Sequence, residues 1–243
     1  MLTQPTLDKL YAMRLNGLAE AWLEQQQQPQ HDDLSFDDRL ALLVERQWLW
    51  RENRALATRL RYARLKQSAC LEDIDFRHPR GLHRATVDQL ASGEWIAQHR
   101  VCLITGPTGV GKSYLACALA HQACRQGYRV RYYYLPKLFR ELTLAQADGS
   151  LTRLLRQMAR LELLVVDDWG LTPLQPDQYR LFLEILDDRT GATLLTSQYP
   201  VSTWHELIGD PTVADALLDR LIHQAYKLEL KGDSLRKKKA ATP

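Results

Sequence analysis

Long apolar runs are missing from this 243-residue sequence. The longest unbroken run is the seven residues 114–120, whereas a membrane-spanning helix needs about 20. The first residues, MLTQPTLDKLYAMR, also lack the charged and then apolar pattern of a secretion signal. We therefore expect a soluble, cytoplasmic protein with no membrane partner.

Cysteine is scarce, and its spacing fits neither a disulfide framework nor a metal site. The four cysteines include no CxxC pair, and Cys117 and Cys124 would lie about 10 Å apart along a helix, too far for a disulfide. The seven histidines show no ligand spacing either. We expect buried, reduced thiols and no structural zinc.

Net charge is small as well, at +3, but the basic residues are concentrated in blocks. Residues 46–66 hold seven Lys/Arg against one acid, and residues 121–161 hold eight against two. The sequence from Arg220 onward adds seven against two, including Arg-Lys-Lys-Lys at 236–239. Such blocks on a nearly neutral chain favour nucleic acid as a partner, with a solvated helix face as the alternative.

Residues 1–68 are predicted to form a small helical module. Apolar residues recur at helical spacing from Leu7 to Trp22, and this segment ends near Pro29. Ser35 then caps a second, longer helix that has two acids in its first turn. The apolar residues expected on one side of that helix are Leu40, Leu43, Val44, Trp48 and Leu56.

Residues 69–243 are predicted to form a second domain, of the α/β class. After a connector at 69–100, short apolar runs alternate with helices, which is typical of a parallel sheet with crossover helices. The expected strands are residues 101–105, 129–134, 163–167, 192–196 and 226–230. The predicted fold is therefore a three-layer α/β domain with a five-stranded parallel sheet, preceded by the helical module.

The strongest motif is Gly-Pro-Thr-Gly-Val-Gly-Lys-Ser at 106–113, a complete GxxxxGK[ST] between a predicted strand and a predicted helix at 113–126. Its glycines let the backbone wrap a phosphate chain with N–H groups pointing inward. Lys112 supplies a cation to the β and γ phosphates, and Ser113 supplies a hydroxyl to magnesium. The residues expected to hold ATP are Gly106, Pro107, Thr108, Gly109, Val110, Gly111, Lys112, Ser113 and Tyr114.

A second motif, Leu-Leu-Val-Val-Asp-Asp at 163–168, runs from a buried strand into two carboxylates. Because open α/β sheets bind ligands at the carboxyl ends of their strands, we expect Asp167 in the magnesium shell and Asp168 as the general base for the attacking water. A whole strand and helix separate this motif from the phosphate loop, an order similar to that of the RecA and AAA+ branch of P-loop proteins. No NKxD guanine-reading motif occurs, which argues against a GTPase.

The AAA+ likeness implies two further site elements. In AAA+ proteins the fourth strand ends in a polar sensor of the γ phosphate; here Thr196, Ser197 and Gln198 are the candidates, and Gln198 is counted among the groups at the reaction centre. The helix at 214–222 carries Arg220, which resembles the arginine finger that reaches the ATP site of a neighbouring subunit. An arginine on a solvated helix face is the alternative.

Blocks along the whole chain resemble one AAA+ family, the IstB proteins, which are ATP-dependent helpers of insertion-sequence transposition related to the DnaC helicase loaders. These blocks are LVERQWLWRENRALATRLRYARLK, LEDIDFRHPRGL, GPTGVGKSYLA, LLVVDDWG, TSQYP and LKGDSLRKKK. The resemblance implies a bacterial ATPase that binds duplex DNA as a homo-oligomer and partners the transposase of its own element. Two alternatives stay open: a DnaC-like loader of a replicative helicase, and an adaptor whose nucleotide never turns over.

Two features depart from most AAA+ enzymes. Those enzymes have Asp-Glu where this chain has Asp167-Asp168, and the shorter second side chain is expected to slow hydrolysis. Only 13 residues follow Leu230, too few for the helical lid of most AAA+ proteins. Arg236 is then the remaining candidate for an arginine that reaches the nucleotide of its own or an adjacent subunit.

The second basic block resembles the extra helix that lines the channel of initiator and loader AAA+ assemblies. Residues 135–160 are predicted to form helices broken at 148–149. No recognition-helix or zinc-finger signature accompanies them, so we expect contacts to DNA phosphates with little sequence preference. The residues expected to make these contacts are Lys137, Arg140, Arg153 and Arg156.

Overall fold

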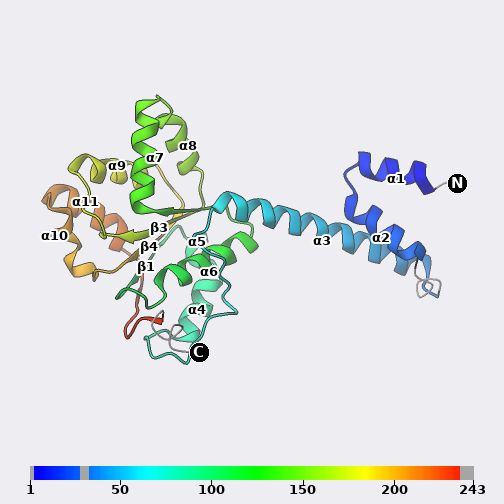
Figure 1. Cartoon of the computed structure of the whole chain (residues 1–243), viewed down its shortest axis with the longest axis horizontal. Helices are drawn as coiled ribbons and strands as arrows, with labels where there is room; N and C mark the ends of the chain where they lie inside the picture. Colours follow the sequence, from blue (N-terminus) through cyan, green and yellow to red (C-terminus); the bar gives the residue numbers. More distant parts are fainter. Residues whose placement is uncertain (1–2, 28–32, 236–243) are drawn as a thin grey trace, which may run out of the picture. The chain divides into compact units, whose positions relative to one another are not determined.

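The structure is a computed structural model that describes residues 3–27 and 33–235. The chain forms two compact units, residues 1–58 and residues 59–243. One long helix, α3 (Phe36–Ala63), contributes to both units because it continues past residue 58 (Figure 1). The domain division after residue 68 therefore stays a prediction, and each unit is described by itself.

Unit 1 consists of helices in the described residues, as its apolar spacing predicts. The segment from Leu7 to Trp22 is not one helix, because α1 (Thr3–Ala12) and α2 (Asn16–Gln27) are separated by a turn in which Arg14 has a φ of 59°. Gly17 of α2 lies so close to α3 that an added Cβ would be 2.5 Å from Cβ of Trp50. Small size at this position is thus what allows the two helices to meet.

Helix α3 begins as predicted, with its cap at Ser35. The backbone N–H of Asp38 donates to Ser35 Oγ at 3.2 Å, which satisfies one of the unpaired donors of the first turn. Much of the apolar side of this helix remains in solvent, since the exposed fraction is 42% for Leu40, 55% for Val44 and 63% for Trp48. Among the residues that the structure describes, these three side chains are therefore not packed into a core, whereas Leu43 and Leu56 are half-buried.

Unit 2 contains a five-stranded parallel sheet whose strands agree with the predicted ones to within two residues. The strands are β1 (Val101–Thr105), β2 (Val130–Tyr134), β3 (Leu163–Trp169), β4 (Ala192–Ser197) and β5 (Tyr226–Glu229). Their order in the sheet is β2-β3-β4-β1-β5, and every described pairing is parallel. Strand β4 thus lies between the phosphate-loop strand β1 and the acidic strand β3, which confirms the RecA and AAA+ type of order.

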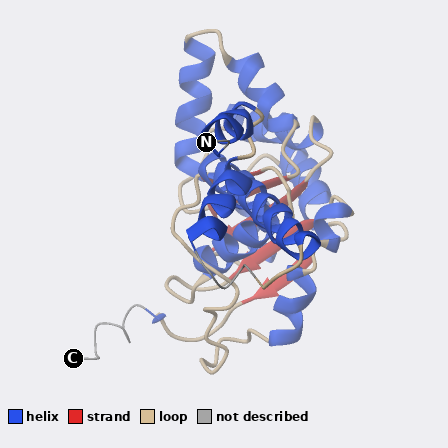
Figure 2. Cartoon of the chain, turned by 90° about the vertical axis from the view of Figure 1, so that its right-hand side faces the viewer, coloured by secondary structure: helices blue, strands red, loops and turns tan. Residues whose placement is uncertain are grey.

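Helices cover the sheet and complete the predicted α/β class (Figure 2). The helix α6 (Lys112–Arg125) buries its small residues against β3 and β4. The connector forms α4 (Arg84–Ala91) and α5 (Glu94–Ala97). The remaining helices are α7 (Leu135–Ala147), α8 (Leu151–Ala159), α9 (Pro176–Asp187), the 3₁₀ turn Val201–Thr203, α10 (Trp204–Ile208) and α11 (Pro211–Ile222). Of the helices in the described residues, none is long and apolar enough to span a membrane.

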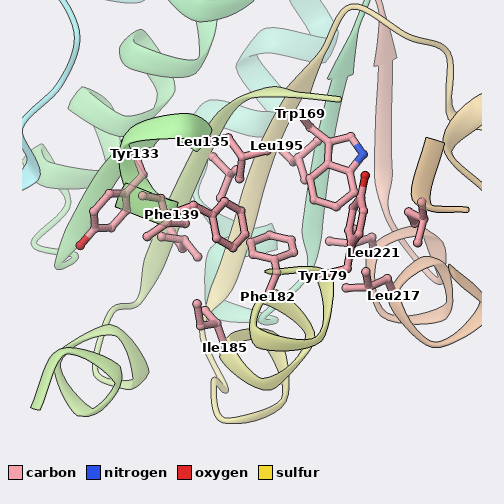
Figure 3. Close-up of a cluster of buried hydrophobic side chains, with 14 of the residues drawn as sticks. Tyr133, Leu135, Phe139, Trp169, Tyr179, Phe182, Ile185, Leu195, Leu217 and Leu221 are labelled. Atoms are coloured by element: carbon pink, nitrogen blue, oxygen red, sulfur yellow. The ribbon is translucent and has the colours of Figure 1, made fainter. Parts of the chain in front are cut away.

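A hydrophobic core under α7, α9 and α11 supports the end of strand β3 (Figure 3). At its centre the indole of Trp169 lies 5.2 Å from the ring of Phe182, 6.0 Å from Tyr179 and 5.8 Å from Trp204, measured between ring centroids. Such aromatic pairs combine a large buried area with a restricted geometry. Because Trp169 follows directly on the two carboxylates of β3, this core fixes the position of the acidic end of the strand.

Candidate nucleotide site

The phosphate loop follows β1 and leads into α6, as the motif requires. Gly106, Gly109 and Gly111 have φ values of 141°, 88° and 99°, in the region that favours glycine. Space is limiting as well, because an added Cβ would lie 2.1 Å from the Leu230 carbonyl oxygen at Gly106 and 2.4 Å from Arg80 Nη1 at Gly111. The glycines therefore allow the loop to adopt its backbone conformation and also allow neighbouring segments to pack closely against it.

Two segments hold this loop from outside. The guanidinium of Arg80 is buried and donates from Nη1 to the Val110 carbonyl at 2.9 Å, while burial lowers the pKa of this guanidinium. The residues after β5 cross the loop, where the backbone N–H of Leu235 donates to the Gly109 carbonyl at 2.9 Å. Leu235 also lines the cavity described below, and Arg236, which follows it, lies outside the described residues.

Lys112 is folded onto its own loop. Its Nζ donates to the carbonyl oxygens of Gly106 at 2.6 Å and Pro107 at 2.8 Å, and the side chain is buried. Burial lowers the pKa of Lys112, although the charges of Asp168 and Asp167 oppose that effect. Both carbonyl acceptors belong to the loop, so this ammonium is already directed into the phosphate-binding turn.

Asp167 is the centre of a dense hydrogen-bond network. Its carboxylate has no solvent exposure and accepts four side-chain donors. These are Ser113 Oγ at 2.9 Å from both oxygens, Thr196 Oγ1 at 2.6 Å, Tyr132 Oη at 2.5 Å and Lys66 Nζ at 3.0 Å. Burial alone would raise its pKa, but the bonds from Thr196, Tyr132 and Lys66 and the charge of Lys66 hold the pKa below its ordinary value.

A backbone irregularity brings Asp168 to the same place. The register of β3 against β4 shifts between Val166 and Trp169, and Asp168 has a φ of 66°. A bulge of this kind breaks the alternation of faces along a strand, so the two consecutive carboxylates both lie near one ammonium, with Lys66 Nζ 3.0 Å from Asp167 and 3.8 Å from Asp168. Asp168 is partly exposed and lines the cavity.

The three polar residues at the end of β4 have three different surroundings. Thr196 is buried and bonds the carboxylate of Asp167, while its Oγ1 also accepts from the Asp168 N–H at 3.0 Å. Ser197 is buried and donates to the Trp169 carbonyl at 2.8 Å. Gln198 lines the cavity and accepts from Thr108 Oγ1 at 2.7 Å. Of the three, Gln198 is the one that faces the phosphate loop.

A cavity of about 990 Å³ joins these elements. Among the residues expected from the sequence, those lining it are Thr108, Gly109, Gly111, Lys112, Ser113, Tyr114, Asp168, Gln198 and Lys137. The donor set fits a nucleotide with magnesium, since a serine hydroxyl and a carboxylate lie side by side and Mg²⁺ prefers oxygen ligands completed by phosphates. The described residues contain no cluster of three or more His, Cys, Asp or Glu that would hold a metal by protein ligands alone.

Arg220 does not line this cavity. Its guanidinium forms a two-point ion pair with the carboxylate of Asp187 at the end of α9, through Nε and Oδ1 and through Nη2 and Oδ2, the latter at 3.0 Å. Nη1 donates to the Ala216 carbonyl at 2.9 Å within α11. The side chain is 39% exposed, so Arg220 is accessible on the surface of unit 2 and is paired there.

The expected DNA-contacting residues lie on α7 and α8, which pack against each other (Figure 1). The break between these helices falls at residues 148–150, as predicted. All four residues are exposed. Lys137, in the first turn of α7, also borders the nucleotide cavity. The second basic block therefore extends from the cavity along this helix pair.

Sequence reasoning missed three contributors to the site: Lys66, Tyr132 and Arg80. Lys66 is the last cation of the first basic block, which the charge pattern assigned to nucleic acid instead. Tyr132 lies inside strand β2, where an apolar aromatic residue is expected. No sequence signal distinguishes Arg80 from other arginines of the connector, because its burial depends on contacts with a loop 30 positions away.

Comparisons with known families give one consistent result. The family model of the IstB-like ATP binding proteins matches residues 8–242. A putative insertion sequence ATP-binding protein of Sinorhizobium fredii, y4pL, is 51% identical over 98% of this chain and 98% of its own length. The IS21 putative ATP-binding protein of Pseudomonas aeruginosa is 32% identical over 96% of this chain and 87% of its own length.

Solved structures share the fold of unit 2. The crystal structure of DnaI has a TM-score of 0.57 at 24% identity and covers 67% of this chain and 90% of that chain. The DnaC helicase loader has a TM-score of 0.52 at 21% identity, covering 60% and 87%. The initiator DnaA, bound to AMPPCP and single-stranded DNA, has a TM-score of 0.58 at 19% identity, covering 70% and 52%. At these identities the likeness shows the AAA+ fold alone.

Proposed function

Because the chain belongs to the family of IstB-like ATP-binding proteins, we propose that it is a magnesium-dependent ATPase that assembles on duplex DNA and assists a partner transposase. The observation that carries the enzymatic part is the pairing of Ser113 with Asp167 at 2.9 Å beside a complete phosphate loop. The transposition part rests on the relatives, which are named as ATP-binding proteins of insertion sequences.

In this proposal the loop residues bind the phosphates and the two acids of β3 have separate tasks. Lys112 leaves its loop carbonyls and pairs with the β and γ phosphates, since a buried ammonium binds most strongly where it meets full negative charge. Ser113 and Asp167 hold the magnesium ion, which neutralises phosphate charge when bound. Ser113 lies in the first turn of α6 and Asp167 in strand β3, so the regular structure of these elements positions both groups.

Asp168 is proposed to accept a proton from the attacking water. The left-handed backbone at this position and the bulge in β3 turn its carboxylate toward the cavity, beside the acid that binds the metal. Gln198 is proposed to orient the water or the γ phosphate, because it lines the cavity and contacts Thr108 of the loop. A general base must lie within hydrogen-bond reach of its proton donor, and the proposal requires this of Asp168 and a water in the cavity.

Assembly is proposed to complete the site through Arg220. In the chain by itself this guanidinium is exposed, paired with Asp187 and outside its own cavity. Transfer of the arginine from Asp187 to the γ phosphate of an adjacent subunit would link ATP occupancy to oligomerisation and would supply charge as the transition state develops.

DNA is proposed to lie along α7 and α8. The exposed cations there, together with Lys137 at the cavity border, support contacts to the phosphate backbone, which carry affinity without sequence information. Because the same helix pair adjoins the ATP cavity, nucleotide state and DNA binding are proposed to be coupled.

A helicase loader is the competing function, and the fold of DnaI and DnaC would serve it equally. The insertion-sequence relatives favour the transposase partner, since their likeness spans the helical unit as well as the ATPase unit. The test is to mix the protein with a non-hydrolysable ATP analogue, duplex DNA and either an insertion-sequence transposase or a replicative helicase. The proposal expects a DNA-bound oligomer that retains the transposase; retention of the helicase alone would support the loader instead.

A further inference from the structure

Lys66 is the charged partner of the buried acid at the ATP site. Its Nζ lies 3.0 Å from Asp167 and 3.8 Å from Asp168, and 5.6 Å from the ring centre of Tyr134. The other donors to Asp167 are neutral hydroxyls, and Lys112 donates to loop carbonyls. A fully buried carboxylate needs a compensating cation, and within the described residues Lys66 supplies it.

The two members of this ion pair differ in freedom to move. The Asp167 side chain is completely buried and held by three hydroxyls, whereas the side chain of Lys66 is 41% exposed. Burial alone would lower the pKa of Lys66, but its bond to Asp167 and the charges of Asp167 and Asp168 raise it, so the ammonium stays charged. Separation of the pair therefore means that Lys66 swings away into solvent while Asp167 remains.

The oxygens that Lys66 contacts are those that a magnesium ion needs. Ser113 Oγ marks the metal-binding side of Asp167 by lying 2.9 Å from both carboxylate oxygens. Two cations cannot share this buried acid without mutual repulsion. We propose that Lys66 is a resident counter-ion of Asp167 that is exchanged for magnesium when nucleotide binds.

This exchange would change the backbone that follows α3. Lys66 lies three residues after the end of the helix, and Arg64 between them has a φ of 50°, a left-handed conformation that is strained for an L-residue. The end of α3 is fixed independently, by Arg131 donating to the Tyr62 carbonyl at 2.7 Å and Arg59 donating to the Cys124 carbonyl at 2.7 Å. The backbone N–H groups of Lys66 and Gln67 also bond Cys117, so displacement of Lys66 removes one of the contacts that hold residues 64–67. The ATP site would in this way regulate the segment through which the chain continues toward its amino-terminal unit.

The inference rests on the proposed ATP site, and its first test measures metal affinity without turnover. Mn²⁺ is titrated into the ADP-bound protein and followed by electron paramagnetic resonance, for wild type, Lys66→Met, Lys66→Arg and Arg64→Gln. Lys66→Met should bind Mn²⁺ about tenfold more tightly, because Asp167 has lost its competing cation. Lys66→Arg should stay near wild type. Arg64→Gln is the matched control, since it removes one positive charge from the same segment and cavity wall and should also stay near wild type.

The second test uses the wild-type chain and does not depend on any variant folding. Hydrogen exchange of the backbone at 64–67 should become faster when Mg²⁺ and ADP are added than with ADP alone. Equal or weaker Mn²⁺ binding by Lys66→Met, or an unchanged rate of hydrogen exchange at 64–67, would contradict the proposal that magnesium replaces Lys66 at Asp167. Failure of wild type to bind ADP at all would instead remove the proposed ATP site.

Discussion

Arg220 and Asp187 form a two-point ion pair that joins the last turn of α11 to the end of α9. The arginine proposed to act on a neighbouring subunit is therefore held by an acid of its own subunit. An exposed pair of this kind contributes at most about 1 kcal/mol to stability. Its members can separate at little cost when a phosphate competes for the guanidinium.

Substitutions on either side of this ion pair distinguish a role of Arg220 in the ATP site of a neighbouring subunit from a purely structural role. Arg220→Ala should bind ATP like wild type but lose most ATP turnover and ATP-dependent oligomers, because the transition-state charge of the adjacent site is missing. Asp187→Asn breaks the same ion pair but leaves the arginine, so its turnover should equal or exceed that of wild type. Sedimentation with an ATP analogue and steady-state phosphate release measure both properties.

A mixing experiment provides the control for Arg220. Lys112→Ala protein should not bind nucleotide but has an intact Arg220. When it is mixed with Arg220→Ala protein, some interfaces pair an intact ATP site with an intact arginine, so part of the turnover should return. If Arg220→Ala and Asp187→Asn behave alike, the pair is only structural and Arg220 has no role in a neighbour's site.

Asp168 should affect the reaction without affecting binding. Asp168→Asn keeps the shape of the side chain but removes the base, so we expect ATP affinity within about threefold of wild type and turnover lower by about 10²-fold or more, a typical contribution of a general base. Lys112→Ala should show the opposite pattern and lose binding itself, whereas Lys227→Ala removes an exposed lysine of β5 and should change neither. Equilibrium binding of a fluorescent ATP analogue and single-turnover hydrolysis distinguish the three. Normal hydrolysis by Asp168→Asn would mean that another group positions the water.

Charge on α7 and α8 should determine how DNA affinity depends on salt. Neutralising Lys137, Arg153 and Arg156 together should flatten the slope of log affinity against log salt by up to about 0.9 for each DNA phosphate that the protein no longer neutralises. The matched control neutralises Arg77, Arg180 and Lys227, which are exposed elsewhere on unit 2. Fluorescence anisotropy with several unrelated duplexes measures the slope and the sequence preference. If both triple variants shift the slope equally, only overall charge matters and the helix pair is not the DNA surface.

Thiol reactivity should report the packing of the sheet and of α6. Cys102, Cys117 and Cys124 are buried, and burial raises the pKa of Cys102 to about 12, that of Cys124 to about 11 and that of Cys117 above its ordinary value. A thiol with a pKa near 12 is ionised to only about 10⁻⁴ at pH 8. In the native protein, about one thiol per chain, that of Cys70, should therefore react with a disulfide reagent. All four should react after unfolding. Comparable rates for all four in the native protein would contradict the packing described here.

The fold was largely accessible from the sequence because its strands and its phosphate loop are local patterns. Short apolar runs, the glycine spacing at 106–111 and the two acids of β3 each depend on neighbours in sequence, and their elements form where expected. The division of residues 7–22 into two helices was missed, because the turn depends on the backbone of Arg14 rather than on apolar spacing.

The surroundings of the site residues could not be predicted in the same way. The roles of Thr196 and Ser197 as buried supports depend on the register of β4 against β3. The contact between Lys66 and Asp167 joins positions 101 apart, and no periodicity or motif indicates such a pair. The two adjacent acids could be recognised in the sequence, but the bulge that brings both carboxylates close to the Lys66 ammonium could not be predicted from it.

Steady-state ATP turnover by the wild-type protein tests the central claim most directly. It is measured with Mg²⁺ or with EDTA, and with or without a duplex longer than one subunit's footprint. The proposed ATPase should require the metal, and its turnover should change on addition of duplex DNA. The rate per subunit should rise with protein concentration, because Arg220 acts between subunits. A protein that binds ATP tightly with Mg²⁺ but releases no phosphate under any of these conditions would be a nucleotide-dependent adaptor, and the ATPase account would be wrong.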